Sequence, residues 1–188
     1  MVWIIITIVL LVAFGPVLYL LPTKKDRRLA ALRQQARLVG FVVELKPVRK
    51  LNPDARDRVT AGGEVRVPQH DSVAYGLGLR SRLEHLKPWR LLKGAGTPQP
   101  VAGWVLDDGP TKDRDLDYVE AFESLFARLP SDTVAMELGV RVITCYWLEK
   151  YPADAATVNA LHEVMTSLGE QLCDRDEQIA TEIEDRNS

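Results

Sequence analysis

The sequence predicts a single N-terminal transmembrane helix followed by a cytoplasmic α+β domain, in which a small antiparallel sheet precedes a helical C-terminal region. Three observations lead to this fold class. The first 22 residues carry no charged side chain. Residues 41–110 hold short apolar and β-branched runs between glycine- and proline-rich stretches, a pattern typical of strands and turns. Residues 111–188 place apolar side chains three and four positions apart, as helices do.

The uncharged N-terminal run has the length of a membrane span. Its residues 2–21, at about 1.5 Å each, make about 30 Å, the thickness of the hydrocarbon core of a bilayer. A cleavable signal peptide has a basic start and small residues at its cleavage site. Here no Lys or Arg precedes the run, and a basic cluster follows it. The run is therefore predicted to be an uncleaved anchor over residues 1–22.

The basic cluster sets the predicted topology. It consists of Lys24, Lys25, Arg27 and Arg28. Because cytoplasmic loops carry an excess of cations, the C-terminal side is predicted to be cytoplasmic and the N-terminus to be outside, in a bacterial inner membrane. The same four residues are the predicted contacts with the membrane surface, since anionic lipids attract nearby cations by about 1 kcal/mol each.

The net charge of −2 hides a difference between the two halves. Residues 24–96 hold 17 basic and 7 acidic side chains, whereas residues 101–188 hold 7 basic and 19 acidic ones. The basic half would lie beside anionic lipids and the acidic half away from them, or the two halves neutralise one another within one fold. Nucleic acid is not an expected partner, because no basic stripe alternates with stacking aromatic side chains.

Residues 23–40 are predicted to form a basic juxtamembrane helix. Thr23 and Asp26 are spaced as in a capping box, and Gly40 is a typical helix stop. A β-rich part follows over residues 41–110. Its predicted strands are 41–46, 73–79, 89–93 and 102–108, and a hairpin is expected about Gly62-Gly63. Trp89 and Trp104 are expected to anchor the apolar face of this sheet.

The remaining residues, 111–188, are predicted to form an acidic helical part. A first helix ends at Pro130. Residues 131–150 are apolar almost all round, so their length favours a buried helix, although VRVITCYW alone has the composition of a strand. A long final helix carries an apolar stripe, which is the predicted contact with a partner helix. The residues chosen for that contact are Leu161, Met165, Leu168 and Leu172.

No catalytic, cofactor-binding or metal site is predicted. His70-Asp71-Ser72 has the residue types of a catalytic triad, but side chains adjacent in sequence point apart. Cys145, His162 and Cys173 lack the short spacing of zinc ligands. The alternation of Asp113, Asp115 and Asp117 lacks the glycine and glutamate of a calcium-binding loop. We therefore do not expect an enzyme.

The stretch RVTAGGEV, which holds Val59, Thr60, Gly62 and Gly63, follows the anchor and the basic helix. Together these features resemble the small accessory subunit of bacterial preprotein translocase. The resemblance covers about the first 65 residues. It implies a glycine turn in a compact β unit. The layout of the whole chain resembles single-anchor inner-membrane proteins of proteobacteria, which implies a location and no activity.

The leading functional hypothesis is a non-catalytic adaptor or accessory subunit of an inner-membrane protein complex. The partners it implies are the lipid bilayer and other inner-membrane proteins. Two alternatives stay open. One is a homo-oligomeric structural protein that assembles through the final helix, and the other is a membrane-tethered enzyme or nucleotide-binding module whose site has no linear motif.

Overall fold

The computed structural model describes residues 3, 23–59, 63–110 and 117–187. The predicted anchor over 1–22 lies outside the described residues, apart from Trp3. Within the described ranges, no helix combines the length and the apolar character that a membrane crossing requires. This finding overturns the predicted single-pass location in a bacterial inner membrane, with the N-terminus outside and a cytoplasmic C-terminal domain. It also overturns the transmembrane part of the predicted fold class.

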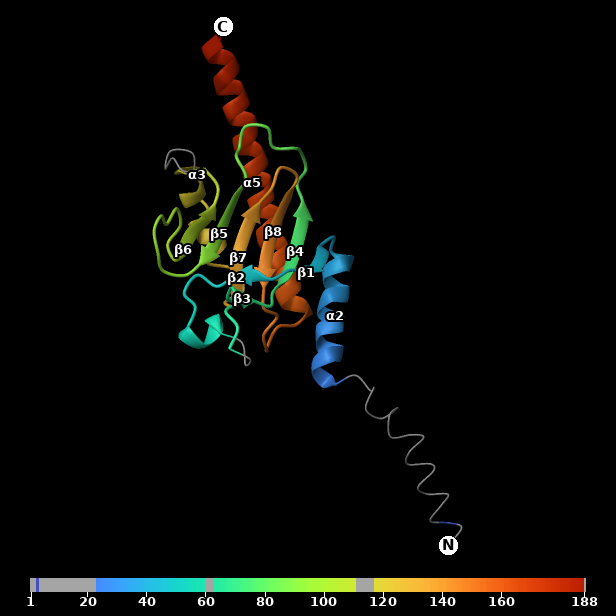
Figure 1. The fold of residues 1–188 in the computed structure, drawn as a ribbon. Helices are drawn as coiled ribbons and strands as arrows, with labels where there is room; N and C mark the ends of the chain where they lie inside the picture. Colours follow the sequence, from blue (N-terminus) through green and yellow to red (C-terminus); the bar gives the residue numbers. More distant parts are fainter. Residues whose placement is uncertain (1–2, 4–22, 60–62, 111–116, 188) are drawn as a thin grey trace.

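A six-stranded antiparallel sheet forms the centre of the molecule (Figure 1). The strand order is β1-β4-β8-β7-β5-β6. The strands are β1 (Val42–Leu45), β4 (Val73–Gly78), β5 (Trp89–Lys93), β6 (Trp104–Asp108), β7 (Thr133–Leu138) and β8 (Val142–Trp147). The four strands predicted between residues 41 and 108 are confirmed. The predicted small sheet is wrong, because two further strands come from the part of the chain predicted to be helical.

Residues 131–150 form the hairpin β7–β8 and not a buried helix. The chain reverses at Gly139, whose N–H donates to the Val142 carbonyl over 2.8 Å. The stretch is apolar almost all round because both faces of this central hairpin are covered. Met136 packs among the helices on one face, and Ala135 and Tyr146 are buried on the other.

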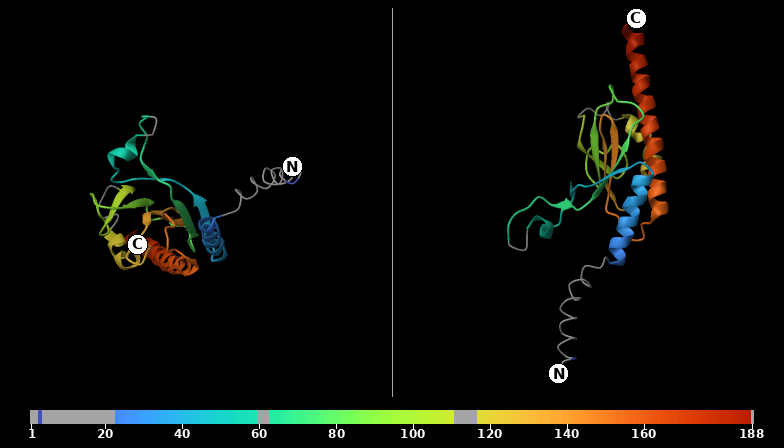
Figure 2. Two further views of the ribbon diagram at one scale, coloured as in Figure 1. Left: turned by 90° about the horizontal axis from the view of Figure 1, so that it is seen from below. Right: turned by 90° about the vertical axis from the view of Figure 1, so that its right-hand side faces the viewer.

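Helices cover one face of the sheet, as Figure 2 shows. They are α2 (Lys24–Leu38), α3 (Asp117–Glu120), α4 (Glu123–Phe126) and α5 (Ala155–Asn187). The predicted capping box of α2 is confirmed, with Thr23 and Asp26 exchanging hydrogen bonds. The predicted helix before Pro130 is present only as α3 and α4, and residues 111–116 lie outside the described residues.

The main core lies between the sheet and this helical layer. Its largest buried side chains come from the strands, and they include Tyr75, Trp89 and Trp147. Trp104 also packs there, so the expectation that Trp89 and Trp104 anchor the apolar face is confirmed. Burying a large side chain of this kind stabilises the fold by about 2–3 kcal/mol.

An arm crosses the face of the sheet that the helices leave uncovered (Figure 2). The arm comprises residues 47–59 and 63–70, with the short strands β2 (Val48–Arg49) and β3 (Gln69–His70) and the 3-10 helix η1 (Ala55–Arg58). Near the predicted Gly62-Gly63 hairpin, a bridge joins Val59 to Val65. The arm closes a second, smaller core that contains Val48, Ala74, Leu92, Ala135 and Tyr146.

Candidate functional site

Strand β1 lies at one edge of the sheet, with β4 on its only paired side. The N–H of Lys46 donates to the carbonyl of Ser72, over 3.1 Å. Because bonded and non-bonded pairs alternate in an antiparallel ladder, the β1–β4 register makes Glu44 another bonded position. Val43 and Leu45 therefore turn their backbone N–H and C=O groups away from β4. No other described residue forms a backbone hydrogen bond with these outward groups.

The side chains beside this edge are also open to solvent. Val42 is 64% exposed and Leu45 is 76% exposed, and Glu44 between them is exposed as well. The opposite edge, β6, is covered by the loop before it, where the N–H of Leu106 donates to the Pro98 carbonyl over 3.1 Å. The two edges of the sheet thus differ, and β1 is the open one.

The start of β1 is firmly positioned. Gly40 ends α2 with a φ of 100°, a conformation that favours glycine. The N–H of Phe41 then donates to the Ala36 carbonyl at 2.9 Å. The Phe41 ring meets the rings of Tyr75 and His162 edge-on, with centroids 5.6 Å and 5.5 Å away. These contacts fix the direction in which β1 leaves the helix.

The buried carboxylate of Glu149 connects α2 to β4, the strand next to β1. Glu149, which follows β8, accepts hydrogen bonds from Arg33 Nε and Nη2 at 3.0 Å and 2.6 Å. It also accepts one from the Tyr75 hydroxyl at 2.6 Å. Bonding to Glu149 raises the pKa of Arg33, and burial, together with the bond to Glu149, raises the pKa of Tyr75. Arg28 adds hydrogen bonds to the backbone carbonyls of Glu149 and Ala153.

A second charged cluster lies on the face of the sheet that carries the arm. Glu137 of β7 accepts a hydrogen bond from Arg90 Nε at 2.9 Å and one from the Tyr146 hydroxyl at 2.5 Å. Burial alone would raise the pKa of Glu137, but these two donors outweigh it and lower that pKa. Asp107 pairs with Arg49 of the arm, so the cluster fastens the arm to β6.

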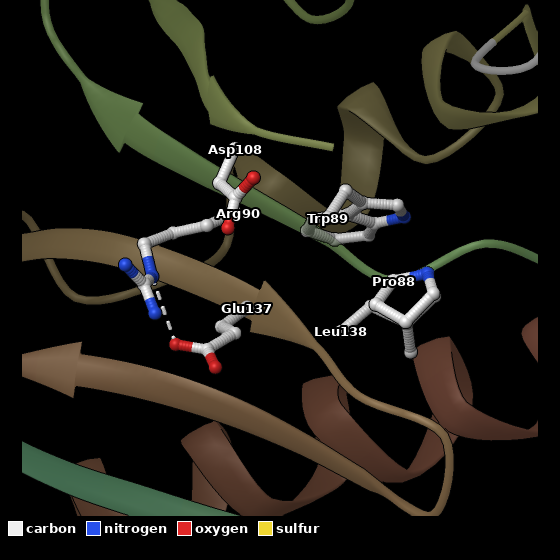
Figure 3. A pocket seen from close by; sticks show the side chains of 6 residues that line it. All are labelled: Pro88, Trp89, Arg90, Asp108, Glu137 and Leu138. Atoms are coloured by element: carbon white, nitrogen blue, oxygen red, sulfur yellow. Dashed lines mark hydrogen bonds and ion pairs between the residues drawn. The ribbon is translucent and has the colours of Figure 1, made fainter. Parts of the chain in front are cut away.

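A shallow pocket of about 180 Å³ opens beside this cluster (Figure 3). It is lined by Pro88, Trp89, Arg90, Asp108, Glu137 and Leu138. Arg90 and Glu137 are paired with each other across it. The lining contains no Ser, Thr, Cys, His or Lys, so it offers neither a nucleophile nor a histidine base. Arg90 and Glu137 belong to the charged cluster described above, and Asp108 is the last residue of β6.

The residues predicted to contact a membrane surface lie at the beginning of α2. Lys24, Lys25 and Arg27 are exposed, whereas Arg28 is half-buried and bonded to the turn after β8. Their role at a lipid surface stays a prediction.

The residues predicted to contact a partner helix lie in the core instead. Leu161, Met165, Leu168 and Leu172 are each at most 1% exposed. Their stripe packs in the main core against the chain's own sheet. These side chains are therefore not available for binding to another helix.

Among the described residues, the candidate catalytic and metal-binding side chains do not form a common metal site. Ser72 donates to the Lys46 carbonyl at 2.7 Å, and burial lowers the pKa of His70. Cys145 and Cys173 are buried thiols, and burial raises the pKa of Cys145 to about 12. Among the described residues, no group of His, Cys, Asp and Glu side chains could hold a metal ion. Asp113 and Asp115 lie outside the described residues.

The open edge of β1 was not found from the sequence. The strand itself was predicted at 41–46, but its neighbours depend on pairing with β4, which lies about 30 residues further along the chain. The stretch Val42-Val43-Glu44-Leu45 does not alternate apolar and polar residues, so its sequence gives no sign of which side of the strand is left without a partner.

The chain gives no significant match to a protein-family model, to a curated protein or to a solved structure. The resemblance to the small translocase subunit therefore stays a prediction.

Proposed function

We propose that the chain is a non-catalytic adaptor that binds an extended segment of another protein along β1. This proposal rests on the open edge of β1, where the backbone N–H and C=O groups of Val43 and Leu45 face away from β4. An added strand would take up these groups as hydrogen-bond partners, which is the common mode of β-augmentation. β1 is short and is followed by Lys46 and Pro47, which limit the edge available to a partner to the stretch around Val43 and Leu45. The exposed apolar side chains beside that stretch favour a binding role.

The occupant that fits is a segment of a different protein and not a second copy of β1. An antiparallel pair of two β1 strands that uses both outward positions would place Val43 opposite Leu45. Glu44 of one copy would then stand directly opposite Glu44 of the other. Like charges in such a position destabilise a strand pair. Antiparallel self-pairing is therefore disfavoured at the register that uses both Val43 and Leu45.

The same geometry specifies the chemistry of the partner segment. A Lys or Arg opposite Glu44 would form a cross-strand pair, which contributes about 0.2–1 kcal/mol. An apolar side chain next to Leu45 would cover its exposed surface. The partner is thus an extended segment that combines apolar side chains with a basic residue at the position facing Glu44.

Synthetic peptides test this proposal with the full chain. Two short peptides of alternating valine and threonine carry either a lysine or a glutamate at the centre, and fluorescence anisotropy measures their affinity. We expect the lysine peptide to bind roughly two- to fivefold more tightly, and Glu44→Lys to reverse this preference. The amides of Val43 and Leu45 should exchange more slowly with the peptide bound, while those of β6 stay unchanged.

A proline substitution gives a matched pair of variants. Leu45→Pro removes an outward N–H without removing a hydrogen bond to β4, so peptide binding should weaken by about fivefold or more. Leu45→Ala keeps that N–H and serves as the control for the lost side chain. The proposal is wrong if neither peptide binds, or if both bind equally to the native chain and to Glu44→Lys.

A further inference from the structure

One end of the molecule gathers three segments that are far apart in the sequence. They are the first turn of α2, the outer part of the arm around Val59 and Val65, and the turn after β8 that carries Tyr151. Figures 1 and 2 show all three at the same end, opposite the C-terminal end of α5. We call this end the basic pole. The guanidinium of Arg28 lies 6.0 Å from the Tyr151 ring, which joins two of the segments.

The basic pole differs in charge from the opposite end. Lys24, Lys25 and Arg27 are exposed in the first turn of α2, with Asp26 as the acidic residue among them. The arm holds five basic and three acidic side chains over residues 47–70. At the other end, residues 177–187 of α5 hold four acidic side chains and one basic one. The first turn of α2 and the arm are thus net basic, and the last turns of α5 are net acidic. Beside those last turns, Arg80 of the loop after β4 pairs with Asp174 and Glu177.

Apolar side chains project from the same pole. Val65 is 87% exposed and Val67 is 70% exposed, and both belong to the arm. Tyr151 is 84% exposed. These side chains leave the body of the protein beside exposed cations, on separate segments that reach the same end.

We propose that the basic pole binds the surface of an anionic lipid bilayer. Cations near such a surface are attracted by about 1 kcal/mol each, which the exposed residues of α2 would provide. Tyrosine favours the headgroup region because its ring is apolar and its hydroxyl is polar. Valines on a projecting arm add apolar area that can enter the boundary below the headgroups. The contact is peripheral, and no described helix has to cross the bilayer.

A lipid surface suits these observations better than an acidic protein does. The exposed groups are spread over three separate segments and do not line one groove. A flat, fluid surface can meet all of them at once, and its anionic headgroups complement the cations. The acidic end of α5 would then point away from the surface, where repulsion from the lipids is weakest.

Site-specific fluorescence tests the proposed orientation with the full chain. Cys145 and Cys173 are both buried, so a thiol reagent would label an introduced surface cysteine. An environment-sensitive dye is placed by Val67→Cys or Tyr151→Cys, and by Ile183→Cys near the acidic end as the control. Each labelled chain is mixed with phosphatidylcholine vesicles or with vesicles that also contain phosphatidylglycerol.

We expect the emission at positions 67 and 151 to shift to the blue with the anionic vesicles and much less with the neutral ones, and the emission at 183 to stay unchanged. The proposal is overturned if the emission shifts at neither position 67 nor position 151. An equal shift with neutral vesicles, or an equal shift at position 183, overturns it as well. The peptide measurements at β1 use no lipid, so the two proposals can fail separately.

Charge variants give a second measurement of the same contact. Lys25→Gln should weaken sedimentation with the anionic vesicles by about fivefold, the loss expected for one cation near a charged surface. Arg186→Gln, near the acidic end, is the matched control and should leave binding unchanged. Equal effects of the two variants would mean that the basic pole is not the surface that faces the lipid.

Discussion

Two buried carboxylates show how single residues hold distant parts of this fold together. Glu149 joins α2 to β4 through Arg33 and Tyr75. Asp176 of α5 accepts three backbone N–H bonds from residues 84–86, at 2.7–3.0 Å. Because an isolated buried charge is very costly, each carboxylate persists only with these partners. Both residues therefore act as connections between elements.

The hydrogen bonds of Asp176 predict a dependence of stability on pH. Burial alone would raise the pKa of Asp176, but the three backbone N–H groups outweigh it and hold the pKa below its ordinary value. The stabilisation is therefore complete above the unfolded-state pKa of about 3.9, and it is lost as the pH falls through the lower folded-state pKa. At pH 7, Asp176→Asn should lower the free energy of unfolding by about 1–3 kcal/mol.

Urea unfolding of the native chain and of Asp176→Asn, repeated from pH 7 down to about pH 2, measures this effect. The difference between the two proteins should shrink below about pH 4. Asp174→Asn is the control, because Asp174 lies on the same helix in an exposed ion pair with Arg80 and should contribute less than about 1 kcal/mol. A difference that stays constant over this pH range would contradict the account.

At the scale of elements, the junction between α2 and β1 rests on one glycine. Gly40 has a φ of 100°, and a Cβ added there would meet nothing within 4 Å. Gly40→Ala should therefore cost about 1–2 kcal/mol through backbone strain alone. Gly78, which ends β4, also has open space around an added Cβ but no positive φ, so Gly78→Ala should change stability by less than about 0.5 kcal/mol. Chemical denaturation measures the free energy of unfolding of both variants. Equal decreases for the two would contradict the role of the positive φ at Gly40.

The elements that the sequence predicts well are those with local signals. The capping residues Thr23 and Asp26 mark the start of α2, and Trp89 begins a strand as predicted. The hairpin over residues 131–150 was missed for a physical reason. Its strands are buried on both faces, so the alternation that identifies a strand disappears, and length alone was a poor guide.

The candidate site was harder to predict than the elements that form it. Val43 and Leu45 have free outward groups only because β4, and no other strand, pairs with β1. That neighbour is set by packing between distant segments, which one sequence does not reveal. The apolar stripe of Leu161 and Leu168 shows the same limit, since a sequence cannot tell whether the covering surface belongs to the same chain.

At the scale of the whole molecule, α5 has a buried part and a projecting part. Leu161 to Leu172 supply the core, whereas residues 181–186 are all exposed and extend beyond the sheet in Figures 1 and 2. The contribution of α5 to the core therefore comes from its earlier, buried turns. Its last turns contribute mainly negative charge.

A truncation after Ala180 tests this division. It removes only the projecting turns, so the free energy of unfolding should change by less than about 0.5 kcal/mol. Leu168→Ala, within the buried part, should cost about 2–5 kcal/mol. Thermal and urea unfolding measure both proteins. If the truncated chain is destabilised as much as Leu168→Ala, the projecting turns support the fold in a way that their exposure does not indicate.

The projecting end of α5 is rigidly connected to the core of the protein. Residues 181–187 continue the helix for about 10 Å, and the helix is anchored in the core by its preceding turns. A rigid fluorophore attached to those last turns would tumble with the entire particle and not independently of it. Its rotational correlation time would therefore report an increase in particle size directly, without any probe near the surfaces proposed to bind.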